Sequence, residues 1–101
     1  MESKRALINA IAEERIGRLF HLAENSVGSD DKLARSYVAL LERISSHYKV
    51  GIPRSIRSRI CKRCMMALVP GANCSVVLAS SKKYIVYKCR MCGGERHVYY
   101  K

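Results

Sequence analysis

The stretch that decides the fold is CKRC, Cys61–Cys64, together with its counterpart CRMC, Cys89–Cys92. Each is a C-x2-C pair, and the 24 residues between them are enough for a β-hairpin to carry the second pair back onto the first. Gly93, directly after the second pair, is expected to adopt a positive φ. Four thiolates that converge in this way suit one tetrahedral metal ion, and the predicted ligands are Cys61, Cys64, Cys89 and Cys92.

Zinc is the metal that such a tetrathiolate site most often holds, and iron, as in a rubredoxin-like site, is the alternative. Four protein ligands leave no position for water or substrate, so the predicted Zn²⁺ is structural and no catalytic residue is predicted. Disulfides are the competing interpretation, but five cysteines fit pairing poorly. The fifth, Cys74, matches neither pair and is expected to be a small buried side chain rather than a ligand.

The residues around the cysteine pairs predict three strands. β-branched and aromatic residues are concentrated in SVVLA (75–79), KYIVYKC (83–89) and ERHVYY (95–100), and SSKK is expected to form the turn between the first two. The predicted C-terminal half is therefore a zinc ribbon with a three-stranded antiparallel β-sheet.

The N-terminal half predicts two helices. The first runs from Ser3 to Glu24, where apolar residues recur at helical spacing. Its predicted apolar face, into which Arg15 projects, consists of Ile8, Ile11, Ala12, Leu19, Leu22 and Ala23. Ser29 or Asp30 is expected to cap the second helix, and Gly51 and Pro53 to end it. The predicted seam of the second helix consists of Ala34, Tyr37, Leu41, Ile44 and Tyr48.

The expected fold class is thus small α+β, with an N-terminal antiparallel helical hairpin in residues 1–50 and a basic linker plus zinc-ribbon module in residues 51–101. Two helices can bury one seam but leave little core for independent stability. Their apolar stripes either face each other and the ribbon or present a surface to a protein partner. The candidate partner-binding residues are Ile8, Ile11, Arg15, Leu19, Leu22, Tyr37, Leu41, Ile44 and Tyr48.

Charge is divided unevenly along the chain. Residues 1–50 hold 8 Lys and Arg against 7 acidic residues, whereas residues 51–101 hold 11 against Glu95 alone. A separation this sharp points to a polyanionic partner, because a merely soluble surface mixes both signs. Zinc with four thiolates carries a net charge of about −2, so two cations would neutralise it. The other cations of this half are then left for a polyanionic partner. The candidate RNA-binding cations are Arg54, Arg57, Arg59, Lys62, Arg63, Lys82, Lys83, Lys88, Arg90 and Arg96.

Aromatic residues are interleaved with these cations on the predicted sheet. Tyr84, Tyr87, Tyr99 and Tyr100 lie among them. Such rings can stack on unpaired bases, a mode more typical of RNA than of duplex DNA, although half of them are expected to fill the small core instead.

The N-terminal segment has acidic residues within its apolar runs, so it predicts neither a signal peptide nor a membrane span. Cysteines that serve as metal ligands suit a reducing compartment. We therefore expect a cytoplasmic protein with no membrane partner.

The order of parts resembles the archaeal ribonuclease P protein component 4 family, whose eukaryotic counterpart is a subunit of nuclear ribonuclease P. The segments that carry the resemblance follow the two helices and are GIPRSIRSRICKRC (51–64), GANC (71–74) and YKCRMCGGERHVYYK (87–101). The likeness spans nearly the whole chain. One departure is that Ser75 and Val77 occupy the strand after GANC, where the family is expected to carry arginines.

The resemblance implies a protein subunit of the ribonucleoprotein that removes the 5′ leader from precursor tRNA. Catalysis would belong to the RNA subunit and its Mg²⁺, and this chain would bind and order that RNA. Ribonuclease P protein component 1 would be its heterodimer partner, contacted through the helices, and precursor tRNA would be met through the complex. By position, Cys61, Cys64, Cys89 and Cys92 would be the zinc ligands.

Two other functions compete with this one. The first is a ribosomal or transcription-associated zinc-ribbon adaptor that docks proteins through its helices, and the second is a rubredoxin-type electron carrier. An intrinsic nuclease is disfavoured, because Glu95 stands alone in residues 51–101 and supplies no carboxylate cluster for magnesium.

Overall fold

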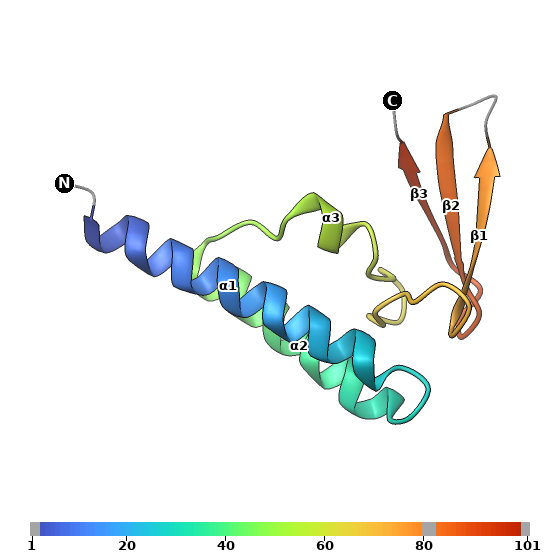
Figure 1. The fold of residues 1–101 in the computed structure, drawn as a ribbon, viewed down its shortest axis with the longest axis horizontal. Coiled ribbons are helices and arrows are strands. Elements are labelled where there is room, and N and C mark those ends of the chain that lie inside the picture. The colour runs from blue at the N-terminus through green and yellow to red at the C-terminus, as the bar shows by residue number, and fades with distance from the viewer. Residues whose placement is uncertain (1–2, 80–82, 100–101) are drawn as a thin grey trace.

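The computed structural model describes residues 3–79 and 83–99. It contains two long helices, a short third helix and a three-stranded antiparallel sheet of order β1-β2-β3 (Figure 1). The bounds are α1 Ser3–Ser26, α2 Asp31–Tyr48, α3 Arg54–Arg57, β1 Cys74–Ala79, β2 Tyr84–Cys89 and β3 Glu95–Tyr99. The predicted α+β class is confirmed. Lys82 and Tyr100, both singled out in the sequence, lie outside the described residues.

The turn between α1 and α2 has the predicted capping chemistry. Asp30 is the N-cap of α2, and its Oδ1 accepts a hydrogen bond of 3.1 Å from the Leu33 amide. Asp31 Oδ1 accepts another, of 2.8 Å, from the Gly28 amide. At the other end, α2 stops at Lys49, which adopts a left-handed conformation with φ 56°. Within the described residues, neither long helix meets the length and apolarity required to cross a bilayer.

The buried face of α1 differs from the predicted one. It consists of Ala12, Ile16, Phe20 and Ala23, of which Ala12 and Ala23 also belong to the predicted face. Ile16, Phe20 and Ala23 pack with Val38 and Leu41 of α2. Ile8, Ile11 and Leu22, expected on the apolar face, are 41%, 46% and 39% exposed. Apolar residues occur around most of the circumference of α1, so their spacing alone did not determine which side of the helix is buried. The bulky Ile16 and Phe20 decide it, because they fill the space beneath the linker.

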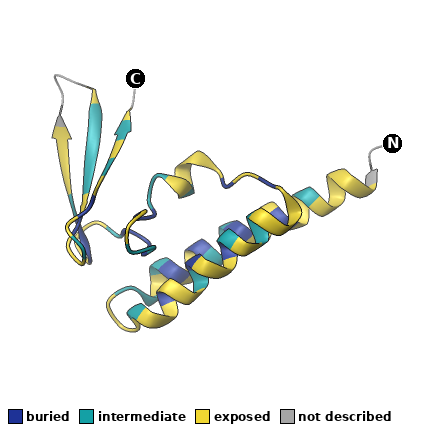
Figure 2. Ribbon diagram, turned by 180° about the vertical axis from the view of Figure 1, so that it is seen from behind, coloured by how far each residue is buried: buried dark blue, intermediate teal, exposed yellow. Residues whose placement is uncertain are grey.

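The linker and the first cysteine pair close this core from one side. Ile52, Ile60 and Ala67 belong to the same buried cluster as Ile16 and Leu41. Figure 2 shows the buried positions on the facing sides of the two long helices, while the outer sides are exposed. The hairpin therefore shares its core with the beginning of the ribbon, and the division of the chain at residue 50 stays a prediction.

The sheet projects away from the helices (Figure 1) and is open over much of its length. Cys74 pairs with Cys89 at its base, and these two residues are buried. Further along β1, Val76, Val77 and Leu78 are 45%, 54% and 61% exposed. Because alternate residues of a strand point to opposite faces, this exposure affects both faces of β1. The sheet is thus held at its base, where the cysteines meet.

Candidate metal centre

Four cysteine sulfurs converge where the two C-x2-C turns meet. The Sγ atoms of Cys61, Cys64, Cys89 and Cys92 all lie within 4.8 Å of one another. Cys61 Sγ is 3.5 Å from Cys92 Sγ, and Cys64 Sγ is 3.6 Å from Cys89 Sγ. A tetrahedral ion with metal–sulfur bonds of about 2.3 Å needs sulfurs about 3.8 Å apart. A disulfide needs about 2.05 Å. The arrangement therefore fits one metal ion and excludes the disulfide interpretation of these residues.

The two turns have the same backbone hydrogen bonds, and we name them the first knuckle (Cys61–Met66) and the second knuckle (Cys89–Gly94). The Cys61 amide donates to Met66 O at 2.9 Å, and the Cys89 amide donates to Gly94 O at 2.8 Å. The fifth residue of each knuckle has a positive φ, 57° at Met65 and 79° at Gly93. The predicted conformation of Gly93 is confirmed. Two equivalent turns thus present two sulfurs each toward a common centre.

The surroundings of the sulfurs affect their protonation in the metal-free protein. A backbone hydrogen bond from Gly94, assisted by one from the Cys61 side chain, lowers the pKa of Cys92 to about 7. Burial raises the pKa of Cys64 to about 12 and also raises the pKa of Cys61. Cys92 is therefore the first of these three thiols to ionise. Because a metal ion must displace the remaining protons, its binding releases protons and weakens as the pH falls.

Cys74 lies beside the centre without being part of the ligand group. It is fully buried, packs with Leu68, Cys61 and Cys89, and is not among the four clustered sulfurs. Burial raises the pKa of the Cys74 thiol, which favours its neutral form. The structure agrees with the expectation that this residue is a small apolar side chain.

Asn73, which sequence reasoning did not single out as a site residue, connects the two knuckles. Its Oδ1 accepts from the Val69 amide at 2.8 Å, and its Nδ2 donates to Ala67 O at 2.8 Å. Its own carbonyl accepts from the Arg90 amide at 2.9 Å. The side chain thus holds the segment after the first knuckle, while the backbone holds the second. Its place in the turn GANC was the available signal, since asparagine often bonds nearby backbone in turns.

We expect Asn73→Ala to lower the free energy of unfolding of the metal-loaded protein by about 1–3 kcal/mol, because it leaves the Val69 amide and Ala67 carbonyl without partners. Urea unfolding followed by circular dichroism measures this. Asn73→Asp keeps the acceptor for the Val69 amide but places a buried negative charge beside Ala67 O, so its loss should be at least as large. Equal unfolding midpoints for Asn73→Ala and wild type would contradict the role assigned to this side chain.

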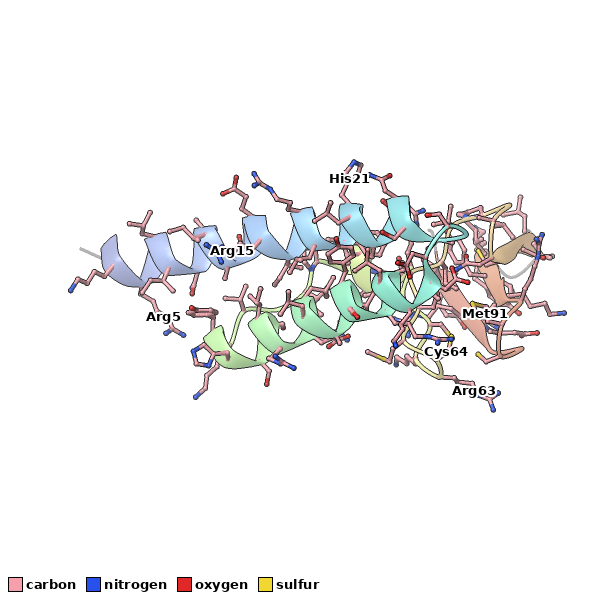
Figure 3. The ribbon with its side chains drawn as sticks, turned by 90° about the horizontal axis from the view of Figure 1, so that it is seen from below. Arg5, Arg15, His21, Arg63, Cys64 and Met91 are labelled. Carbon is pink, nitrogen blue, oxygen red and sulfur yellow. The ribbon has the colours of Figure 1, made fainter. Side chains whose placement is uncertain are left out.

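The predicted cations are spread over the basic half of the chain. Those that are exposed are Arg54, Arg57, Lys62, Arg63, Lys83, Lys88 and Arg90. Lys62, Arg63, Lys88 and Arg90 lie in or next to the knuckles, whereas Lys83 precedes β2 at the far end of the sheet and Arg54 contacts Tyr99 at that end. Figure 3 shows Arg63 extending away from the chain beside Cys64. Lys88 Nζ lies 3.8 Å from Glu95 Oε2 in an exposed ion pair, which is weak in water. Arg96 is half-buried.

Arg59 is placed differently from the other cations. Its Nη2 forms an ion pair of 2.9 Å with Glu24 Oε2 of α1 and donates to Leu68 O at 3.4 Å. Its guanidinium carbon lies 5.8 Å from the centre of the Phe20 ring. These contacts tie the helical hairpin to the ribbon. Arg59 is therefore part of the internal packing, and we do not propose it as an RNA-binding residue.

The face of the hairpin opposite α3 carries two adjoining hollows between α1 and α2, which we call the hairpin groove. The first, of about 380 Å³, is lined by Ile8, Ile11, Ala12, Arg15, Ile44 and Tyr48. The second, of about 280 Å³, is lined by Arg15, Arg18, Leu19, Leu22, Leu40 and Ile44. Figure 3 looks onto this face and shows Arg15 between the two helices.

Seven of the nine candidate partner-binding residues line the hairpin groove. Tyr37 and Leu41 do not. Tyr37 packs against the core, and Leu41 is fully buried within it. The reason is the direction of the seam on α2, whose central residues face α1 and the linker rather than solvent.

A helical hairpin, a tetrathiolate site on two knuckles, a three-stranded sheet and an excess of exposed cations define a small basic zinc-ribbon protein. Residues 15–93 match the family described as the RNAse P Rpr2/Rpp21/SNM1 subunit domain. The chain belongs to this family of ribonuclease P subunits.

Relatives and solved structures agree with this membership. Ribonuclease P protein component 4 of Methanosarcina acetivorans is 40% identical over 99% of this chain and 92% of its own length. The component 4 of Pyrococcus furiosus is 44% identical over 82% of this chain and 72% of its own. A chain in the cryo-EM structure of archaeal ribonuclease P with mature tRNA superposes with a TM-score of 0.79 at 33% identity, covering 89% of this chain and 77% of that one. The structure of Pfu Rpp21 gives 0.61 at 41% identity, covering 86% and 97%.

Proposed function

We propose that this chain binds and orders the RNA of ribonuclease P through its basic ribbon, and so contributes to the 5′ processing of tRNA. Its family membership supports a role in ribonuclease P. The observation that carries the mode of action is the set of seven exposed cations in the half of the chain that the cysteine cluster holds together. The same membership favours this function over a ribosomal or transcriptional adaptor. The cytoplasm is the proposed setting, because reduced thiols persist there.

We propose that the metal ion held by the four cysteines is zinc. Zinc has no geometric preference that the converging sulfurs violate, and it is the usual ion of closed sites with four cysteines. Its role is to hold the two knuckles together, so it performs no step of the reaction. Magnesium and the cleavage chemistry belong to the RNA in this proposal, since Glu95 is the single acidic residue of the basic half. A colourless, zinc-containing native protein would agree, whereas a visible absorption band would indicate iron.

The ribbon acts as a fixed support for positive charge. Arg54, Arg57, Arg63 and Arg90 carry planar guanidiniums, which can contact a phosphate through two hydrogen bonds. Their mutual repulsion in the free protein is relieved when a polyanion binds and releases its counterions. In this proposal, precursor tRNA is bound by the assembled ribonuclease P, of which this chain is one subunit.

We expect the affinity of the purified chain for ribonuclease P RNA to fall steeply with salt. If five phosphates are neutralised, the log–log slope should be roughly −4. Filter binding across a series of salt concentrations measures it. A flat salt dependence would contradict binding through phosphates, and binding no tighter than to unrelated structured RNA would contradict the assignment to this RNA.

The proposed protein partner is ribonuclease P protein component 1, and the proposed contact is the hairpin groove. The groove is apolar at Ile8, Ile11 and Leu22, whose exposure is costly in a free protein, and it contains Arg15, which can pair with a carboxylate of the partner.

We expect Ile11→Glu to weaken binding of component 1 at least 10-fold, because a carboxylate would be desolvated in an apolar interface. Isothermal titration calorimetry with purified component 1 measures the loss. The matched control is Leu33→Glu, since Leu33 is 40% exposed on α2 against 46% for Ile11 and does not line the groove. Equal affinities for the two variants would argue against the groove as the contact.

A further inference from the structure

A hollow of about 210 Å³ lies between the α3 segment and β3. Arg54 and Arg57 of α3 line one side, and Arg96, His97 and Tyr99 of β3 line the other. Two segments about forty residues apart in the sequence thus bring three arginines to the lining of one hollow. Figure 1 shows α3 on the side of the sheet that ends in β3, and β3 is an edge strand among the strands of residues 3–79 and 83–99.

The charge of this hollow is not neutralised by the residues that form it. Among the described residues that line it, none is acidic. The adjacent Glu95 lies 3.3 Å from His97 Nε2 of the lining and 3.8 Å from Lys88 Nζ, and among the described residues it forms no ion pair with Arg54, Arg57 or Arg96. Arg54 is held in position by a hydrogen bond of 3.3 Å from its Nη2 to Tyr99 O. Three cations that line one hollow without an acid favour the binding of an anion, and guanidiniums match the geometry of phosphate.

An aromatic surface adjoins Arg54, which contacts Tyr99, on the face of β3 opposite Arg96. The rings of His97 and Tyr84 stack at 4.8 Å with an interplanar angle of 9°. Tyr84 contacts Tyr99 edge to face at 5.2 Å, and Tyr99 is 62% exposed. The neighbouring rings support Tyr99 from one direction, and the remainder of the residue is open to solvent. A supported, exposed ring beside a phosphate-binding hollow has the composition of a nucleotide site.

We propose that this hollow binds an unpaired RNA segment, with a phosphate on Arg54 and Arg57 at the edge of β3 and the neighbouring base stacked on Tyr99, while Arg96 projects from the opposite face of the strand. This deepens the proposed function and rests on it. An unpaired base exposes its face for stacking, whereas a base within a duplex is covered by its neighbours. An acidic peptide would satisfy the arginines but would leave the ring unused.

The path of the bound strand continues toward the metal centre. A smaller hollow, of about 40 Å³, is lined by Lys62 and Arg63 of the first knuckle and shares Arg96 with the first hollow; Glu95, which is paired with Lys88 and His97, also lines it. The stem of Arg63 passes close to Gly94, where an added Cβ would lie 2.9 Å from Arg63 Cδ. Arg96 therefore joins two groups of cations, and the next phosphate of the strand is assigned to Lys62 and Arg63.

The test uses the full-length, metal-loaded chain and two fluorescent probes, a single-stranded oligouridylate and a blunt RNA duplex of the same length. Tyr99→Ala should weaken single-strand binding by about 5- to 150-fold, the range that corresponds to one stacked base, and should change duplex binding less than twofold. Tyr99→Phe should retain single-strand binding because it keeps the ring. Arg57→Ala should reduce the salt slope by about one. Arg43→Ala, a change of an exposed cation on α2, should leave all values unchanged.

Unchanged single-strand binding by Tyr99→Ala, with one metal ion still bound per chain, would overturn the inference. Equal losses for single strand and duplex would also overturn it, because the site would then recognise only the phosphate backbone of the RNA and not an unpaired base. Stronger binding of oligoglutamate than of oligouridylate would assign the hollow to an acidic protein instead. Each of these results leaves the proposed function intact if wild type binds ribonuclease P RNA with a steep salt dependence, whereas failure of that binding overturns the proposed function itself.

Discussion

Removal of the metal is expected to unfold the ribbon and to abolish RNA binding with it. The sheet is buried at its base, at Cys74 and Cys89, while much of β1 is exposed. An apolar core of this size supplies at most about 3–5 kcal/mol, whereas structural zinc contributes on the order of 10–16 kcal/mol of apparent binding free energy. Without the ion, the remaining contacts cannot offset the conformational entropy of the two knuckles and three strands.

Chelation followed by far-ultraviolet circular dichroism and metal analysis measures this effect. The helices should lose stability as well, because Ile60 and Ala67 belong to the same core as Ile16 and Leu41. Cys61→Ser should reproduce the loss of metal and of strand signal. Cys74→Ala is the matched control, since Cys74 is buried beside the centre but is not a ligand, and it should keep one metal ion per chain. Retention of the strand signal and of RNA binding after complete metal removal would refute the prediction.

Leu41→Ala is expected to lower the free energy of unfolding of the metal-loaded protein by about 2–5 kcal/mol. Leu41 is fully buried between α1, α2 and the linker, so its truncation removes apolar contacts and leaves a cavity. Ile11→Ala should change the same free energy by less than about 0.5 kcal/mol, because Ile11 is 46% exposed and lines the hairpin groove. The pair separates the two sides of the hairpin, one that stabilises the chain and one that is available to a partner.

Urea unfolding midpoints of the two variants, with the metal content of each verified, provide the measurement. Component 1 binding adds a second readout, since Ile11→Ala should weaken it while a still-folded Leu41→Ala variant should not. A larger loss of stability in Ile11→Ala than in Leu41→Ala would mean that the first prediction of the buried face, made from periodicity, was correct after all.

Much of the fold could be predicted because its signals are local. Asp30 caps α2, the two C-x2-C pairs form equivalent turns, and the three strands occur where β-branched and aromatic residues are concentrated. α3 was not predicted. It is a single turn in a segment rich in charged residues. The local signal for its start is Pro53, whose carbonyl accepts hydrogen bonds from the Ile56 and Arg57 amides.

The amino-acid sequence by itself determined which four cysteines come together, the class of fold and the division of charge, because each depends on residue type and spacing along the chain. The tertiary structure decided which face of α1 is buried, and it assigned Arg59 to Glu24 and Phe20 rather than to the exposed cations. It also brought Arg54 and Arg57 to Arg96 and Tyr99. The physical reason is that packing and ion pairing depend on distances between segments far apart in the chain, which no local pattern of residues contains.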